Sequence, residues 1–477
     1  MKKLIALLLA LVMVVSVLAA CNTEKPVETK PAETKPAETK PAETNPAQTE
    51  PAGEQIVLRL AHWGLGTEEE YNLERRMIDL YMELNPNIKI EIAEEITGDW
   101  NAALATAAAG NTLPDVFLIG NVPTAVANEW TLDLTEYAAA DEDWNKLPAS
   151  MIESTYYGNQ IHAIPLAMHI NGIYINVDLF EEMNVDPLES GYTMEEFEEA
   201  VEAVTDIASG KIALADYNIY EWYCSVLNPE LGFFTYANDQ VALNDPAFIE
   251  AVKYSNDIFT NKYSFNALND DEKAVFGVGS DWDAFINGSL ALKMDATWNA
   301  SFFGNDVDYN IKFITLPEGK SVIIPDYICI GKSTQHPQEA YDFAKWMAHS
   351  KEGILARLDI DEAEDSVSFA SIPLILDEEI SERFFANYPM EGVQEVYEEF
   401  MDTAIVESYK FAPGYENARW NGLTGITVGD VANANMATVI DACVRGVLNI
   451  DDYAEQLNTM ANSFLKEVQD IIDKVTG

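Results

Sequence analysis

The stretch IVLRLAHW, residues 56–63, is an apolar run rich in β-branched side chains, and it predicts a buried strand. An amphipathic helix pattern follows at 68–84, and the alternating sequence IKIEI at 88–92 predicts a second strand. Residues 99–110 predict another helix, and PDVFLIG at 114–120 predicts a third strand. Strands separated by helices of about 10–15 residues form βαβ units. This region therefore predicts an α/β fold with a parallel sheet.

Two local signals set the expected bounds of the first helix. Thr67 and Glu70 have the spacing of a capping box, which predicts that the helix starts there. Asn85 and Pro86 predict its end. No glycine-rich phosphate loop follows any of the three strands, so the region does not predict a nucleotide site.

Residues 1–20 have a positive start, an apolar middle and small residues at the end, which is typical of a secretory signal peptide. The apolar run at 4–20 is at the lower edge of the roughly 17–25 residues that cross a bilayer. LAAC at 18–21 resembles the bacterial lipobox, which implies a diacylglyceryl group on Cys21 and a firm two-chain anchor. The alternative is an uncleaved signal anchor with an incidental cysteine.

Residues 21–54 contain the repeat PVETK, PAETK, PAETK, PAETN, PAQTE. A proline in every repeat blocks helices and sheet ladders, so we predict a disordered linker. Together with Cys21, this linker predicts a protein that is tethered to the outer face of the bacterial cytoplasmic membrane.

The remaining residues, about 420 of 477, are too many for one core and predict two domains. The chain has 80 acidic and 28 basic residues, a net charge of −52. Such a surface repels nucleic acid and, less strictly, disfavours a highly anionic ligand. The alternative is that the acidity only keeps an exported protein soluble.

Three cysteines follow Cys21, namely Cys224, Cys329 and Cys443. They are far apart and odd in number, and the chain has no CxxC or Cys/His metal spacing. We therefore expect small buried residues rather than a disulfide framework.

Four stretches together resemble the bacterial extracellular solute-binding proteins of ABC transporters, in the sugar-binding branch that includes maltose-binding protein. They are ALATAAAGNTLPDVF at 103–117, GNQIHAIPLAMHINGIYINVDLFEEMNVD at 158–186, FINGSLALKMDATW at 285–298 and IGKSTQHPQEAYDFAKWMAHSKEG at 330–353. The chain departs from the family pattern at IYINVD, residues 173–178, and at an insert covering 364–385.

The resemblance implies a two-lobe periplasmic-binding-protein-like α/β fold with a hinge and a ligand cleft between the lobes. We expect the first lobe at 56–165 with 331–385, and the second at 166–330 with 386–477. The strands would cross between lobes near Ile164 and Ile330. The resemblance also implies a small-molecule ligand, ABC permease subunits as partners, and no catalysis.

Sugars present an apolar C–H face and a rim of hydroxyl groups, so a sugar site needs aromatic rings beside polar side chains. Such residues are expected after strands and at the crossings, because ligands of α/β sheets bind there. The candidates are Trp63, Asn121, His169, Trp222, Asp295, Trp298, Tyr327 and Trp420.

The resemblance implies the roles of His169, Trp222, Trp298 and Trp420, since these match positions where the family contacts sugar. Trp298 is the strongest candidate. Six of these residues also have a structural alternative: a turn position for Asn121, and packing in the core for His169 and the four tryptophans. Tyr220 is the alternative to Trp222 as the aromatic residue of the cleft wall.

An enzyme remains an alternative, as a secreted carbohydrate-active protein. The chain has no GxSxG or HExxH motif, and a glycosidase carboxylate pair cannot be recognised from spacing. The acidic run at 359–370 lacks the glycine and the final glutamate of an EF-hand. We expect no cofactor, no metal and a monomer. A peptide, a polyamine or another solute remains an alternative ligand.

Overall fold

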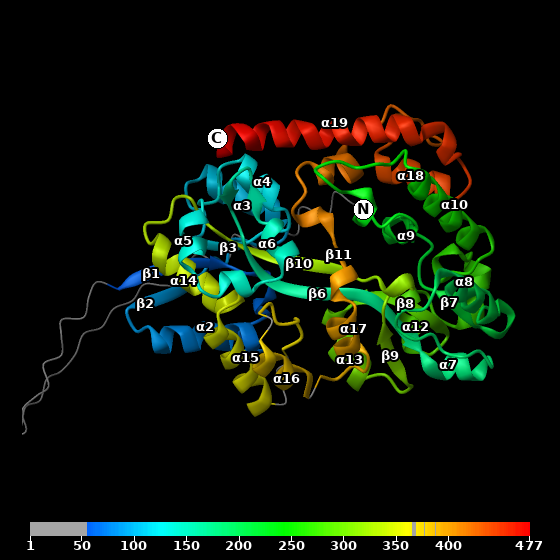
Figure 1. Cartoon of the computed structure of the whole chain (residues 1–477), viewed down its shortest axis with the longest axis horizontal. Coiled ribbons are helices and arrows are strands. Elements are labelled where there is room, and N and C mark those ends of the chain that lie inside the picture. The colour runs from blue at the N-terminus through cyan, green and yellow to red at the C-terminus, as the bar shows by residue number, and fades with distance from the viewer. Residues whose placement is uncertain (1–54, 365–368, 376, 387) are drawn as a thin grey trace, which may run out of the picture. The chain divides into compact units, whose positions relative to one another are not determined.

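The computed structural model describes residues 55–364, 369–375, 377–386 and 388–477 (Figure 1). The expected signal peptide, the lipidation site Cys21 and the linker at 21–54 lie outside these residues. In the described part of the chain, no helix is long and apolar enough to cross a membrane.

One sheet of nine strands organises the described residues, in the order β2-β1-β3-β10-β6-β8-β7, with β11 beside β10 and β9 beside β6. A small hairpin is separate from it. The strands are β1 (Ile56–Ala61), β2 (Ile88–Ile92), β3 (Val116–Leu118), β4 (Tyr156–Tyr157), β5 (Gln160–Ile161), β6 (Ile164–Asn176), β7 (Ile212–Leu214), β8 (Leu290–Ala296), β9 (Ile311–Ile314), β10 (Val322–Ile330) and β11 (Ile405–Val406).

Helices pack on both faces of this sheet (Figure 1). They are α2 (Leu73–Leu84), α3 (Trp100–Ala109), α4 (Val122–Ala127), α5 (Thr135–Ala140), α6 (Ala149–Glu153), α7 (Val177–Glu182), α8 (Met194–Ala203), α9 (Tyr220–Leu227), α10 (Pro246–Thr260), α11 (Asp270–Phe276), α12 (Asp281–Ile286), α13 (Ala300–Asn305), α14 (Pro337–Ala348), α15 (Lys351–Ala363), α16 (Glu378–Ala386), α17 (Val393–Glu399), α18 (Met436–Val444) and α19 (Ile450–Thr476).

The first three strands form the parallel arrangement that the sequence predicts. Strand β1 pairs in parallel with β2, where Ile56 is opposite Ile88, and with β3, where Leu60 is opposite Val116. Helix α3 connects β2 to β3 and begins after Asp99, whose carboxylate accepts a hydrogen bond from the backbone of Ala102. The α/β prediction is confirmed.

The start of the first helix differs from the prediction. The capping-box hydrogen bonds between Thr67 and Glu70 do form, at 2.6 and 3.3 Å, but they close a turn. The backbone of Tyr71 then adopts a φ of 39°, which interrupts any helix. Helix α2 begins only at Leu73, after Asn72 caps it through the backbone N–H of Arg75.

Two long strands join the lobes of the protein. The first part of β6 pairs with β10, where Ile164 is opposite Ile328, and its last part pairs with β8 and β9 through Ile173. Strand β10 in turn pairs with β3, where Cys329 is opposite Phe117. The sheet is therefore continuous from one lobe to the other, and both expected crossings lie at ends of these strands.

Successive side chains of β10 alternate between two hydrophobic cores. Ile328 and Ile330 pack into a core with α2, α14 and α15, which we call the lower core. Tyr327 and Cys329 pack on the opposite face with residues of α3 and α4, in the upper core. A third core, which we call the helical core, lies between α8, α9, α10, α18 and the sheet.

Helix α19 joins two of these cores. Leu457 and Leu465 pack in the helical core, whereas Ile472 near its end packs in the upper core. The same helix contacts α10 and the π-helical turn η10 (Asn417–Asn421), and its end reaches β4 and α4. Figure 1 shows α19 passing from α10 to α4. A single helix thus links elements that the sequence assigns to different lobes.

The three cysteines of the body are free and buried, as predicted. Burial raises the pKa of Cys224 and of Cys443 to about 12, and it also raises the pKa of Cys329. The thiols are therefore protonated at neutral pH.

Candidate ligand site

Several candidate residues follow the carboxyl ends of parallel strands. Strand β1 ends just before Trp63, which begins the short helix η1 (Trp63–Leu65), and β3 ends before Asn121. In the other lobe, β7 and β8 are also parallel, and they lead to Asp216 and Trp298 respectively. Because parallel strands end at the same edge of a sheet, Trp63 and Asn121 lie at one edge, and Trp298 lies at one edge with Asp216, which is not among the candidates.

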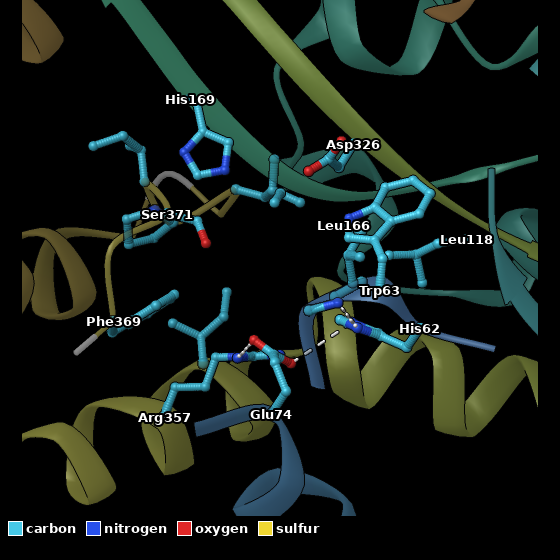
Figure 2. A pocket seen from close by; sticks show the side chains of 17 residues that line it. His62, Trp63, Glu74, Leu118, Leu166, His169, Asp326, Arg357, Phe369 and Ser371 are labelled. Carbon is cyan, nitrogen blue, oxygen red and sulfur yellow. Dashed lines mark hydrogen bonds and ion pairs between the residues drawn. The ribbon is translucent and has the colours of Figure 1, made fainter. Parts of the chain in front are cut away.

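A cavity of about 200 Å³ lies beside the crossing strands (Figure 2). Its lining comes from separate parts of the chain, namely the turn after β1, helix α2, the end of β3, the first half of β6, Asp326 of β10, the end of α14, helix α15 and the segment that follows α15. The lining residues are His62, Trp63, Gly64, Glu74, Leu118, Leu166, Ala167, His169, Asp326, Ala348, Ile354, Arg357, Phe369, Ser371, Ile372, Pro373 and Leu374.

A buried ion pair forms one side of the cavity. The two terminal nitrogens of Arg357 donate to the two carboxylate oxygens of Glu74 at 2.6 and 2.8 Å, and one also donates to the carbonyl of Met347 at 2.7 Å. Burial alone would raise the pKa of Glu74, but the Arg357 guanidinium holds that pKa below its usual value. The pair is thus charged at neutral pH.

His62 extends this polar side. Burial lowers the pKa of its imidazole, so the ring is neutral at pH 7. Its Nδ1 accepts a hydrogen bond from the backbone N–H of Gly64 at 3.0 Å, which orients the adjacent turn. The turn carries Trp63, whose ring packs edge-on against Trp100 and still exposes 41% of its surface. The cavity therefore reaches solvent at Trp63.

His169 projects from β6 into the cavity from the opposite side (Figure 2). Burial lowers its pKa to about 4, so it is neutral over the physiological range. Its Nδ1 is buried and has no hydrogen-bond partner. The centroid of its imidazole ring lies 5.3 Å from the centroid of the Trp298 ring, and the two rings pack edge to face. A buried nitrogen that is free to form a hydrogen bond, next to an exposed aromatic ring, suits a ligand rich in hydroxyl groups.

Asp326 is a further polar group of the cavity. Its carboxylate accepts a hydrogen bond from Lys410 at 2.5 Å. Lys410 follows Tyr409, and the ring of Tyr409 packs 4.8 Å from Trp420. Trp420 belongs to the π-helical turn η10 (Asn417–Asn421) and exposes 36% of its surface. These contacts connect the Trp420 region to the cavity wall.

The structure thus brings together three of the eight sequence candidates. Trp63 and His169 line one cavity, and Trp298, which is 46% exposed, touches His169. Trp420 is exposed and linked to Asp326 only through its neighbours.

Two candidates do not fit a cleft position. Trp222 is only 2% exposed, because its side of α9 packs in the helical core against Phe197 and Tyr223. Tyr327 is fully buried, since the alternation of β10 turns it into the upper core, where its hydroxyl donates to Ser154 at 2.5 Å. We correct both expectations, and both residues belong to the core.

Asn121 and Asp295 use their polar atoms within the protein. The Asn121 side chain caps α4 by accepting from Thr124, and it donates to the carbonyl of Tyr409 at 2.8 Å. The Asp295 carboxylate accepts from the backbone of Ala296 and from Asn299. Asn121 is therefore the turn residue that the sequence left as its alternative, and it also ties β3 to the Tyr409 segment.

Sequence reasoning missed Asp326, Ser371 and the turn that contains Asp216 and Asn218. Asp326 is the one charged residue of the apolar run VIIPDYICI, and this signal was available. The turn follows β7, and the side-chain oxygen of Asn218 is buried with no partner. Burial also raises the pKa of Asp216. Ser371 lies in the insert and gave no signal.

The described residues contain no group of His, Cys, Asp and Glu side chains arranged to hold a metal ion.

The fold and the cavity define a two-lobe binding protein, with a polar cavity where strands cross between the lobes. A family model described as bacterial extracellular solute-binding protein matches residues 66–353. The chain belongs to this family.

Solved structures share this fold. The sugar-binding protein MalE from Xanthomonas citri is 14% identical, with a TM-score of 0.64, over 88% of this chain and 100% of that one. The cyclic alpha-maltosyl-1,6-maltose binding protein from Arthrobacter globiformis is 16% identical, with a TM-score of 0.63, over 87% and 99%. An ABC substrate-binding protein from Listeria monocytogenes, solved with cycloalternan, is 18% identical, with a TM-score of 0.58, over 89% and 99%.

Proposed function

We propose that this protein captures a neutral sugar or oligosaccharide between its two lobes and releases it unchanged. The observation that carries the proposal is the set of exposed tryptophan rings, Trp63, Trp298 and Trp420, beside polar groups that line or adjoin the cavity. Indole rings cover the apolar face of a sugar, and His169 and Asp326 offer partners for its hydroxyl groups.

The charges at the cavity support a neutral ligand. Its cation Arg357 is paired with Glu74, and Lys410 nearby is paired with Asp326. An anionic ligand would have to displace one of these carboxylates, and breaking a buried pair is costly. Binding proteins of similar fold that carry sugar names in their descriptions add to this support.

The proposed mechanism is closure about the hinge. In the open form, Trp63 on one lobe and Trp298 and Trp420 on the other are accessible. A ligand that contacts both lobes has a higher affinity for the closed form and shifts the population toward it. The closed monomer then presents both lobes to an ABC importer, a partner that membership of the solute-binding family supports.

The experiment that tests the proposal is a thermal-shift screen of the purified protein against neutral mono- and oligosaccharides, with peptides and polyamines as controls. A ligand that binds only the folded state raises Tm by mass action. We expect Tm to rise with one sugar series while the sugar stays intact in chromatography of the same samples.

Other results of this screen would contradict the proposal. Loss of the sugar, with product formed in proportion to enzyme, would identify a carbohydrate-active enzyme. A rise in Tm with polyamines or peptides alone would keep the transport role and would remove the reason for the exposed indole rings.

We further propose that Cys21 carries the lipid that holds the protein at the outer face of the cytoplasmic membrane. The support is the LAAC sequence at 18–21 and the extracellular description of the family. In a bacterial host that processes lipoproteins, Cys21→Ser should move the protein from the membrane fraction to the medium or to an unprocessed precursor. An unchanged distribution between fractions would contradict lipid anchoring.

A further inference from the structure

The far wall of the cavity comes from residues 369–374, in the part of the chain that follows α15. Phe369, Ser371 and Leu374 line the cavity, and Phe369 and Leu374 are themselves buried. These residues lie beyond 66–353, the range that matches the family model. The wall is therefore a feature of this chain that the match to the family does not cover.

This wall is fixed in place. The backbone N–H of Ile372 donates to the carbonyl of Met168 on β6 at 3.0 Å, so the segment is bonded directly to the crossing strand. The backbone N–H of Phe369 donates to Asp361 at 2.9 Å. The guanidinium of Arg357 lies 5.7 Å from the centre of the Phe369 ring, which joins the wall to the ion pair with Glu74. Residues 369–374, which close this end of the cavity, are thus held by contacts to β6 and α15.

The cavity is also small. Its volume of about 200 Å³ is below the range of about 300–1,000 Å³ that is typical for sites of drug-sized ligands. One sugar ring fits such a volume and a chain of rings does not. The accessible side lies at Trp63, which lines the cavity and is exposed, and the exposed Trp298 adjoins it through His169.

We propose that the cavity binds the terminal unit of a linear saccharide. Residues 369–374 close the cavity beyond that unit, and the rest of the saccharide extends toward solvent past Trp63 and Trp298. The protein therefore binds saccharides by one end and rejects those that have no free end. This inference rests on the proposed sugar binding and adds to it the shape of the substrate.

The polar groups that line the cavity suit a terminal unit. His169 offers a buried nitrogen that has no partner, Asp326 offers carboxylate oxygen, and the hydroxyl of Ser371 points into the cavity (Figure 2). A terminal sugar has a hydroxyl group at the position where an internal unit is linked onward. Leaving that hydroxyl unpaired when buried would cost about 1–3 kcal/mol, so a built end site recognises it directly.

The test uses isothermal titration of the full chain with unmodified maltohexaose, mannohexaose and xylohexaose. Each sugar that binds is then tested as two derivatives, one blocked at the reducing end by an aminobenzamide group and one blocked at the other end by a methyl ether on the terminal 4-hydroxyl. We expect one block to weaken binding about 100-fold or more and the other to change it by less than about threefold. Maltohexaose is also compared with α-cyclodextrin, which has the same sugar and no ends and should not bind.

Two results overturn the inference while sugar binding stands. They are equal tolerance of both blocks, and binding of α-cyclodextrin as tight as that of maltohexaose. Loss of binding with both blocks would also overturn it, because the second end would then be enclosed as well. If a folded protein binds none of the three sugars, the proposed function itself fails.

A substitution tests whether residues 369–374 close the binding site. Ser371→Trp puts an indole into the cavity and should weaken every linear saccharide about 50-fold or more, with Tm close to that of the parent. Val447→Trp is the matched control, since Val447 is 64% exposed and is not among the cavity residues. Phe369→Ala is the second variant, and it should reduce the difference between the two end-blocked derivatives. Unchanged affinity in Ser371→Trp would remove 369–374 from the site.

Discussion

Trp298 and Trp222 are both tryptophans, and their environments predict opposite results on truncation. Trp298 is largely exposed and touches His169, so Trp298→Ala should weaken sugar binding by about 2 kcal/mol, or roughly thirtyfold, with little change in stability. Trp222→Ala should lower the free energy of unfolding by about 3–5 kcal/mol. Titration calorimetry and urea denaturation measure the two effects.

Two other results for these variants would contradict the proposed role of Trp298. If Trp298→Ala loses as much stability as Trp222→Ala, then Trp298 is a packing residue and its proposed contact with sugar is wrong. If Trp298→Ala keeps both its stability and its affinity, the ligand does not reach this ring.

Glu407 predicts a pH dependence of stability. Burial raises its pKa to about 7, although Lys410 partly opposes this rise. The folded protein therefore holds a proton that the unfolded chain releases near its ordinary value of 4.5. From this group, the free energy of unfolding should fall by roughly 3 kcal/mol as pH rises from about 4.5 to 7, and then level off.

Glu407→Gln should remove that part of the slope, as measured by urea denaturation at several pH values. Glu83→Gln, at an exposed position of α2, is the control and should leave the slope unchanged. An identical slope in Glu407→Gln and the parent protein would show that Glu407 does not hold the proton.

For single residues, the sequence predicts which residue types form the site, but it predicts the positions of only some of them. Trp63 could be predicted because it follows a strand, and Trp298 because it matches a position of the family pattern. Trp222 and Tyr327 were misplaced because α9 is apolar on most of its surface and β10 is buried on both faces, so the pattern does not show which side chain faces the cleft. Ser371 reaches the cavity only through the bond between Ile372 and β6.

Among the elements, α19 links two cores, and adjacent isoleucines near its end test this role. Ile472 is fully buried in the upper core, whereas Ile471 is exposed. Ile472→Ala should lower the free energy of unfolding by about 2–4 kcal/mol because it leaves a cavity. Ile471→Ala should change it by less than about 0.5 kcal/mol. Equal effects in denaturant titration would contradict the packing of this helix end.

Helices and strands with a strong hydrophobic period could be predicted from the sequence, but the residues at which they begin could not. The strands at 56–61, 88–92 and 116–118 were found from apolar runs and alternation, because burial of a sheet imposes these patterns. Helix α2 started later than predicted, since Thr67 and Glu70 can close a turn as well as a helix. The backbone angle of Tyr71 separates these outcomes, and no side-chain pattern encodes it.

For the whole molecule, the net charge of −52 predicts a dependence of stability on salt. Repulsion among excess carboxylates destabilises the compact state, and screening reduces that repulsion, with a Debye length of about 10 Å at 0.1 M salt. We expect Tm to rise by several degrees between low-salt buffer and 0.3 M NaCl or KCl, with similar values for the two salts. A constant or falling Tm in calorimetry would contradict a dominant role for repulsion.

The two-lobe fold could be expected from the order of the four matching stretches, but the cavity could not. Its lining combines residues from His62 to Leu374, and their proximity depends on the pairing of β6 with β10 and on the bond from Ile372 to Met168. Such long-range contacts leave no local period in the sequence.

The burial of Cys224, Cys329 and Cys443 has a practical consequence. Their thiols are inaccessible and protonated, so a maleimide dye reacts with them slowly. A cysteine introduced on the surface near Trp298 would then be the preferred attachment point for a fluorophore. With Cys21 replaced by serine, the protein offers a scaffold for a reagentless optical sensor whose signal reports occupancy of the cleft.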